Sequence, residues 1–257
     1  IRRPQRSTLF PYTTLFRSPL QKIRKMRPEY PVPGREKTHV SVIRDTEATS
    51  AELKVIYFHD NIAQETIGDY RQNLISSLYL SMLNSRYNEK RQEKNPPFLS
   101  AGAGFGKLTS LRSVFSAVCT ADPENVETGI EALAGELSRI RRDGFTDTEF
   151  ARAKEKYAAI MVQLYREAEN TSSEALASEL TRNYFDNEYV PGIENEYILA
   201  VNLLPEIKID EVNSLSDYFF TAKEPLILLS LPDNGKGSEV KLTEEYVKDV
   251  FEKALVS

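Results

Sequence analysis

The order of secondary-structure signals along this chain constrains its fold more than any single motif does. Runs of β-branched and aromatic residues predict strands at 38–44, 53–58, 98–101 and 111–119, and a continuous apolar run predicts a last strand at 226–231. Helical periodicity occupies the segments between and after the strand pairs. Because the strands come in pairs and do not alternate singly with helices, we expect an α+β fold in which helices cover a largely antiparallel sheet.

Local signals mark where the helices begin and end. Apolar residues at three- to five-residue intervals predict a long helix from Ile67 to Tyr87, which Asn95-Pro96-Pro97 ends. Asp122 before Pro123 predicts the N-cap of a second helix that Gly144 stops, and Thr146-Asp-Thr-Glu149 is a capping box. The helix that follows carries an apolar stripe expected to be buried: Phe150, Ala153, Tyr157, Ile160, Leu164 and Ala168. Further helices are predicted at 172–184, 193–203, 209–219 and 243–255.

Composition divides the chain into four parts. Thr8 to Ser18 reads, residue for residue, as one translated frame of a widely used sequencing-library adapter, so we expect residues 1–18 to be an artefact that replaces the true upstream sequence. Residues 19–36 are rich in proline and lack apolar periodicity, which predicts an interdomain linker. We place one α+β domain at 37–234, and we expect 235–257 to begin a helix that leads to a further domain.

Charge and cysteine content exclude several classes of protein. Residues 1–35 carry a net charge of +8 in a chain whose total is −5, so the folded part is acidic and is expected to repel nucleic acid. The sequence contains no apolar stretch of about 18 residues that would predict a transmembrane segment. The lone Cys119 excludes an internal disulfide, and its place in an apolar strand is typical of a buried, inert thiol.

Motifs for catalysis or cofactor binding are incomplete. The run Gly102-Ala-Gly-Phe-Gly-Lys107 resembles a phosphate-binding loop only superficially, because Ala101 and Leu108 occupy two of the required positions, and a glycine-marked bulge or turn in a sheet is the expected structure. The two histidines, His39 and His59, would approach each other if the first two strands formed a hairpin, but catalytic zinc needs three protein ligands. We therefore expect no catalytic residue and no metal ligand in this chain.

Several stretches, taken in order, carry a resemblance to a known family. These are Tyr79-Leu-Ser-Met-Leu-Asn-Ser-Arg86, Asn95-Pro-Pro-Phe98, the helix within 122–144, and the capping box that leads to Ala153-Lys154. Their order and spacing resemble the second domain of a long insulinase (pitrilysin)-family zinc peptidase, over about Pro31 to Leu255. In that family, homologous α+β domains enclose a chamber, and an inverted zinc motif, His-x-x-Glu-His, lies in the first domain.

This chain contains no such motif, so the resemblance implies a non-catalytic, chamber-lining domain of a zinc endopeptidase that degrades peptides or unfolded polypeptides. Zinc is then a cofactor of the parent protein and not of this chain. The implied partners are an upstream catalytic domain, downstream homologous domains of the same polypeptide, and the peptide substrate. Long bacterial members of the family imply a periplasmic setting, and the sequence itself leaves the compartment unknown.

The resemblance also supplies two candidate substrate-facing residues. In the family's substrate-clamping domain an arginine is followed seven positions later by a tyrosine, and both reach toward the peptide. Here Arg91 matches the arginine, but the second position is Phe98, whose ring cannot donate a hydrogen bond to a developing oxyanion. The missing phenol favours a scaffold domain over the clamping one.

An alternative reading belongs to a different functional class. The parent protein would be an inactive, insulinase-like structural or assembly subunit without zinc or peptidase activity. The scarcity of histidine in this chain fits both readings equally well. Chelator-sensitive cleavage of an unfolded peptide by the complete protein would separate them.

Overall fold

The structure is a computed structural model that describes Tyr30, Val32 and residues 36–62, 64–186, 188–221, 224–233 and 242–256. All helices and strands named below belong to one body, Val32–Ser257. The segment expected to derive from an adapter, residues 1–18, lies outside the described residues, as does most of the expected linker 19–36.

A five-stranded sheet forms one layer of this body, and its strands are β1 (His39–Asp45), β2 (Ala51–Asp60), β3 (Ser100–Lys107), β4 (Arg112–Ala121) and β5 (Leu226–Pro232). The strand order is β1-β5-β2-β4-β3. All neighbours are antiparallel except β1 and β5, which are parallel. The expected α+β class with a largely antiparallel sheet is confirmed.

The first two strands do not form a hairpin, because β5 lies between them. The burial of β5 and of β1 explains why β5, and not β1, lies beside β2. In β5, Ile227, Leu229 and Leu231 are all buried, whereas Val40 is the buried residue of β1. A strand with a continuous buried face is more stable inside a sheet, and β1 with few buried residues fits an edge.

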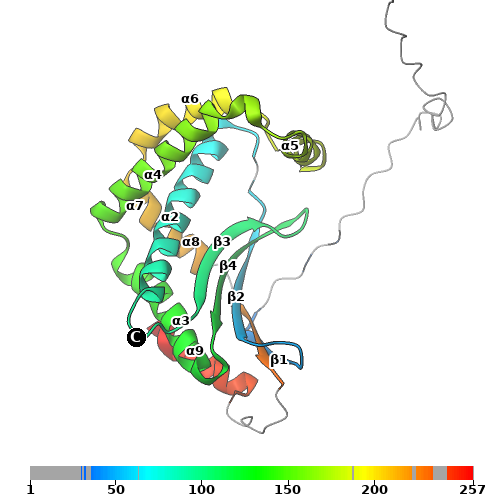
Figure 1. Ribbon diagram of the computed structural model, residues 1–257, viewed down its shortest axis with the longest axis vertical. Coiled ribbons are helices and arrows are strands. Elements are labelled where there is room, and N and C mark those ends of the chain that lie inside the picture. Colours follow the sequence, from blue (N-terminus) through cyan, green and yellow to red (C-terminus); the bar gives the residue numbers. More distant parts are fainter. Residues whose placement is uncertain are drawn as a thin grey trace, which may run out of the picture. The chain divides into compact units, whose positions relative to one another are not determined.

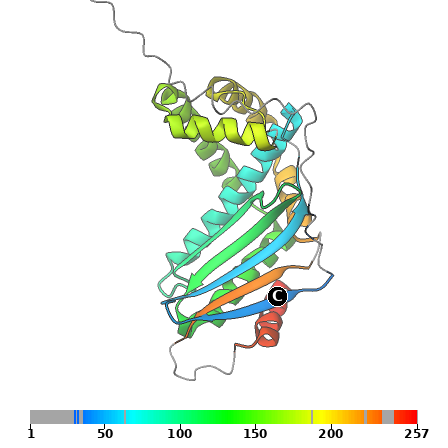
Figure 2. The same cartoon turned by 90° about the vertical axis from the view of Figure 1, so that its right-hand side faces the viewer.

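The helices form the second layer: α2 (Ile67–Arg91), α3 (Val126–Asp143), α4 (Asp147–Arg166), α5 (Ser173–Asp186), α6 (Ile193–Leu203), α7 (Ile209–Asn213), α8 (Leu215–Thr221) and α9 (Glu244–Val256), with short 3₁₀ turns at Pro123–Asn125, Ala168–Asn170 and Leu204–Glu206. The predicted helix at 209–219 is divided into α7 and α8. Figure 1 shows these helices on one side of the sheet except α5, which projects beside the end of the β3–β4 pair, and Figure 2 shows that no described helix covers the other face.

Two of the predicted capping signals have their expected roles, but Asp122 caps the 3₁₀ turn Pro123–Asn125 and not α3, which begins at Val126 after Asn125. The Thr146 hydroxyl accepts from the Glu149 N–H, and the Glu149 carboxylate accepts from the Thr146 N–H at 2.8 Å, so the capping box of α4 is confirmed. Gly144 ends α3 with φ of 70°, in the left-handed region that favours glycine. A Cβ at Gly144 would lie 2.7 Å from Nδ2 of Asn213, so space also requires a glycine here.

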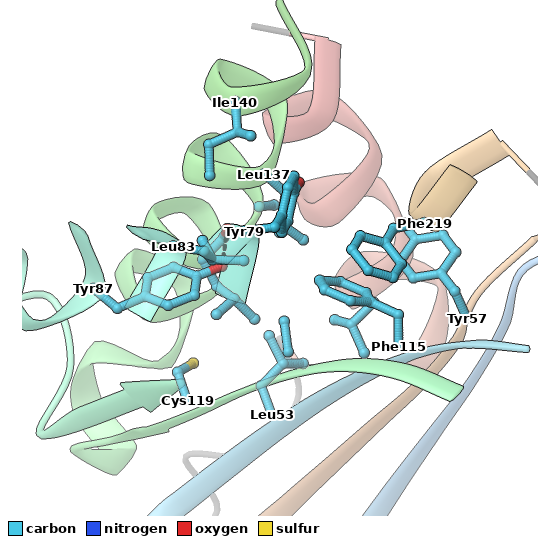
Figure 3. Packing of buried hydrophobic residues seen from close by; sticks show 14 of the residues in the cluster. Leu53, Tyr57, Tyr79, Leu83, Tyr87, Phe115, Cys119, Leu137, Ile140 and Phe219 are labelled. Atoms are coloured by element: carbon cyan, nitrogen blue, oxygen red, sulfur yellow. Dashed lines mark hydrogen bonds between the residues drawn. The ribbon is translucent and has the colours of Figure 1, made fainter. Parts of the chain in front are cut away.

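The core lies between the sheet and the helices α2, α3, α8 and α9 (Figure 3). Phe219 of α8 stacks on Phe115 of β4 with 4.7 Å between ring centroids, and Tyr79 of α2 packs against Phe219 at 5.1 Å. Cys119 is buried as expected, and burial raises the pKa of its thiol to about 12, so the thiol stays protonated and unreactive at neutral pH.

The expected buried stripe of α4 is wrong for the second half of the helix. Ala153 is buried, but Ile160 and Leu164 are 44% and 46% exposed. The second half of α4 packs against α6, where Tyr165 stacks on Tyr197 with 4.8 Å between ring centroids. Packing on α6 rotates the buried line to Met161, which is 4% exposed, and leaves Ile160 and Leu164 facing solvent.

The last helix, α9, packs into the same core as the sheet. Val247 and Phe251 are fully buried, and the Ser138 hydroxyl of α3 donates to the Leu255 carbonyl at 2.9 Å. Residues 235–257 are expected to begin a helix that leads to a further domain, and α9 lies within this segment. In the structure it closes the end of the core beside α3 and β1.

Candidate binding site

The strand β3 forms one edge of the sheet, and Asn84 of α2 covers its middle. The Asn84 amide Nδ2 donates to the Ala103 carbonyl at 3.0 Å, and its Oδ1 accepts from the Ala103 N–H at 2.7 Å. One side chain therefore satisfies the two backbone groups that a neighbouring strand would otherwise bind. Because outward-pointing backbone groups recur at every second residue of an antiparallel edge, those of Phe105 and Lys107 also face away from β4.

The substitution Asn84→Ala is expected to lower the free energy of unfolding by about 1–3 kcal/mol, because Ala103 loses partners for both backbone groups. Urea denaturation followed by circular dichroism would measure the change. The matched control is Asn88→Ala, which removes only an exposed bond to the Asn84 carbonyl in the same helix and is expected to change stability by less than about 0.5 kcal/mol. Equal effects of the two substitutions would contradict the edge-covering role.

A pocket of about 560 Å³ is lined by residues of α2, β3 and α5, and we call it the wedge pocket. Figure 1 shows that α2 and the end of β3 diverge in this region. The lining of the wedge pocket includes Asn73 and Ser76 of α2, Phe105 and Lys107 of β3, and Asp186 of α5. The Lys107 ammonium binds the Asp186 carboxylate at 2.5 Å, which ties the end of α5 to the end of β3. The wedge pocket thus lies directly beside the free backbone groups of the sheet edge.

The turn between β3 and β4 is ordered by Asn61, another residue of the wedge pocket. Its Nδ2 donates to the Thr109 and Ser110 carbonyls at 3.1 and 2.6 Å. Its Oδ1 accepts from the Ser113 hydroxyl at 2.8 Å. These bonds hold the edge of the wedge pocket in one conformation, which favours binding because little ordering is needed when a ligand enters.

A buried ion cluster fixes the other half of α2. The Arg86 guanidinium donates to Glu149 at 2.5 and 2.9 Å, to Glu136 at 3.1 Å and to the Gly144 carbonyl at 3.0 Å. Partial burial alone would raise the pKa of Glu149, but the bonds from Arg86 and Thr146 outweigh it and hold the pKa at about 2. The cluster joins α2, α3 and α4.

The two residues expected to face a substrate have different environments. Arg91 is the last residue of α2 and is exposed. Phe98 is 2% exposed and packs edge-to-face against Tyr87, with 6.2 Å between ring centroids. This burial makes Phe98 a core residue of the body and argues against its contact with a substrate.

The histidines do not form a metal site. His39 is exposed on the edge strand β1, on the far side of β5 from β2. His59 is buried on β2 among aromatic rings, with its ring centroid 4.8 Å from that of Tyr218 and 5.7 Å from that of Phe105. Within the described residues, no three side chains of His, Cys, Asp or Glu are grouped so as to hold a metal ion. These residues do not fit a zinc centre.

The glycine run is neither a bulge nor a turn, which corrects the expectation from sequence. Gly102, Gly104 and Gly106 pair in unbroken register with β4, from Ser100 opposite Thr120 to Lys107 opposite Ser113. A Cβ built at Gly104 or Gly106 would meet no atom within 4 Å. The glycines therefore leave the backbone of β3 bare on the uncovered face of the sheet.

Sequence reasoning missed the residues that form this site. Asn84 belongs to a stretch that carried the family resemblance, but its partner Ala103 lies 19 residues away. Lys107 and Asp186 are 79 residues apart. The run of glycines that ends at Lys107 was the available signal, since a strand that lacks side chains on one face marks a place where another backbone can approach closely.

Comparison with known proteins identifies the family. Residues 10–157 match the peptidase M16 inactive domain, and the chain belongs to this family. A "Zinc protease PQQL-like" protein of Arabidopsis thaliana is 27% identical over 195 residues, which are 76% of this chain and 18% of that protein. A "Probable zinc protease PqqL" of Haemophilus influenzae is 23% identical over 220 residues, which are 84% of this chain and 23% of that protein.

The fold has a solved counterpart. The first half of the periplasmic protease PqqL from Escherichia coli has a TM-score of 0.81 at 15% identity, over 90% of this chain and 50% of that one. The matched residues are 18% and 23% of the two curated relatives, so this chain spans less than a quarter of their length. In the part of the chain that the structure describes, no helix is long and apolar enough to cross a membrane.

Proposed function

We propose that this chain is a non-catalytic domain that lines the chamber of a zinc endopeptidase acting on peptides or unfolded polypeptides. The observation that carries the proposal is the face of the sheet that no described helix covers (Figure 2). The part of the β3 edge that Asn84 does not bind, from Phe105 to Lys107, lies beside this face at the wedge pocket. Unfolded polypeptides offer backbone groups and apolar side chains together. A sheet face with a free edge can bind both.

The side chains on the uncovered face support this proposal. Residues alternate between the two faces of a strand, and those that alternate with the core positions of β2 and β4 include Ile56, Phe58, Val114 and Val118. All four are half-buried, although no described helix covers this face of the sheet. Lys54 and Ser116 lie among them on the same face, so the surface is partly apolar and partly polar. The bare backbone at Gly104 and Gly106 lets an extended chain approach.

The catalytic zinc and its ligands are then in another domain of the parent protein. Two observations support this division: the described residues contain no group that could hold a metal, and the curated relatives carry the names of zinc proteases. The implied partners are an upstream catalytic domain, downstream homologous domains and the peptide itself. In this arrangement the present chain positions the substrate and performs no bond cleavage.

The test is a cleavage assay on the full-length polypeptide with an unfolded peptide as substrate. We expect cleavage that a chelator abolishes and added zinc restores, because the catalytic ion is carried by the other domain. The 257-residue chain alone is the control, and it is expected neither to cleave the peptide nor to retain one equivalent of zinc by elemental analysis. A full-length protein that binds no zinc and cleaves nothing would instead favour the inactive structural subunit.

The same assay tests the lining role. In the full-length protein, Phe58→Ser is expected to raise KM about tenfold with little change in kcat, because it removes apolar contact made equally in the ground and transition states. Glu131→Ala is the matched control, since Glu131 is exposed on α3, on the helical side of the body, and its loss is expected to leave KM unchanged. Unchanged kinetics for Phe58→Ser would refute substrate contact at this face.

A further inference from the structure

Helix α5 has an apolar stripe that no described residue covers. None of its 14 residues is buried, and Leu176, Leu180 and Tyr184 are 49%, 61% and 68% exposed. These three residues are spaced by four positions and therefore share one face of the helix. Figure 1 shows α5 projecting beside the end of the β3–β4 pair, away from the layer that covers the sheet.

The contacts that attach α5 to the body are polar and lie at its end. Asp186 binds Lys107 of β3. In the segment that follows the helix, the Glu188 carbonyl accepts from Asn183 at 2.6 Å, and the Tyr189 N–H donates to the Gln64 carbonyl at 3.0 Å. A helix of this length is only marginally stable in water without tertiary packing of its apolar face. The residues of the apolar stripe make none of these polar contacts. The exposure of the stripe therefore indicates a surface that a partner covers.

The surroundings of the stripe restrict the partner. Ile160 and Leu164 of α4, the preceding helix, are also exposed. Residues 167–188 contain six carboxylates and a single arginine. Asp186 binds Lys107 and Glu188 binds Arg182, and the other four carboxylates make the border of the surface acidic. Two copies of this chain would bring their acidic borders together, which disfavours self-association. The chemistry fits an apolar groove bordered by lysine or arginine.

We propose that the apolar stripe of α5 docks on another domain of the same polypeptide, in a groove of that chemistry. This rests on the proposed function, in which the chain is one domain of a longer protein. Its support is length: the matched residues are 18% and 23% of the two curated relatives, so most of such a polypeptide lies outside the part described here. The surface is thus an interdomain contact that the rest of the polypeptide completes.

Thiol labelling would test the contact directly, because Cys119 is buried and contributes little background. Leu180→Cys places a thiol on the stripe. Ser178→Cys is the matched control, since Ser178 is two residues from both Leu176 and Leu180 and therefore lies on the opposite side of the helix. Both variants are made in the 257-residue chain and in the full-length polypeptide, whose other cysteines are replaced by serine.

In the 257-residue chain, a maleimide is expected to label both positions at similar rates. In the full-length polypeptide, labelling at Leu180→Cys is expected to be about tenfold slower, with Ser178→Cys unchanged. Equal rates in the full-length polypeptide would overturn the proposal and leave chelator-sensitive cleavage unaffected. Slow labelling of Leu180→Cys already in the 257-residue chain would also overturn the proposal. Slow labelling that depends on protein concentration would mean that a second copy covers the stripe, and slow labelling that does not would mean that a segment of the same chain covers it. Ala177→Cys, beside the stripe, is the second reporter if Leu180→Cys fails to fold.

Discussion

Replacing Arg86 with methionine is expected to lower the free energy of unfolding by about 3–5 kcal/mol, because it leaves the buried Glu136 and the partly buried Glu149 without their main partner. Glu136, 2% exposed, would keep only Lys90 at 3.6 Å and Arg139 at 4.0 Å. The Gly144 carbonyl would lose its donor as well. Urea denaturation of the wild-type chain and the variant measures the difference.

The matched control for this prediction is Arg71→Met, because both arginines lie on α2 and bind a glutamate at the start of another helix. Arg71 binds Glu211 at 2.7 Å, but both side chains are about a third exposed. Exposed pairs contribute little, so the control is expected to change stability by less than about 1 kcal/mol. A loss of similar size in both variants would show that burial does not distinguish the two pairs.

The buried ion cluster also sets an expected dependence on pH. The pKa of Glu149 is lowered in the folded state from 4.5 to about 2, so its contribution to stability is present above pH 4.5 and is lost as the pH falls toward 2. In Arg86→Met the pKa of this carboxylate should return toward its ordinary value. The acid-induced loss of stability is therefore expected to be smaller in Arg86→Met than in the wild-type chain.

The second large effect is expected for Phe219→Ala, with a loss of about 3–5 kcal/mol in the free energy of unfolding. Phe219 is fully buried, and its ring centroid lies 4.7, 5.1 and 5.2 Å from those of Phe115, Tyr79 and Phe105. Truncation would leave a cavity where the sheet, α2 and α8 meet (Figure 3). Denaturation in urea measures the loss.

The neighbouring residue in α8 supplies the control for this substitution. Tyr218 is 37% exposed and contacts Phe219 at 5.6 Å, so Tyr218→Ala is expected to lower the free energy of unfolding by less than half as much as Phe219→Ala. A loss below about 1 kcal/mol for Phe219→Ala would mean that the core is able to collapse around the missing ring, contrary to the packing described here.

Local sequence signals predicted the local structure well. The capping box at Thr146, the stop at Gly144 and the apolar run of β5 depend on neighbouring residues alone, and each has its expected role. The α+β class also followed from the order of the elements. These features required no knowledge of which distant segments come together.

Features that depend on distant partners were not predictable in the same way. Periodicity assigned Ile160 to the core, but the position of α6 decides which face of α4 is buried. The site at the sheet edge needs Asn84 to meet Ala103, and Lys107 to meet Asp186. A pattern in one segment cannot specify which side chain from another helix covers a strand edge.

The position of β5 has a consequence for how the chain acquires its structure. This strand begins at residue 226, yet it lies between β1 and β2. During synthesis the two N-terminal strands emerge long before the one that joins them, and their facing edges are unpaired in the interval. Such late, long-range pairing slows folding and exposes strands to association with other nascent chains. The ribosome must therefore release almost the whole domain before its sheet can close.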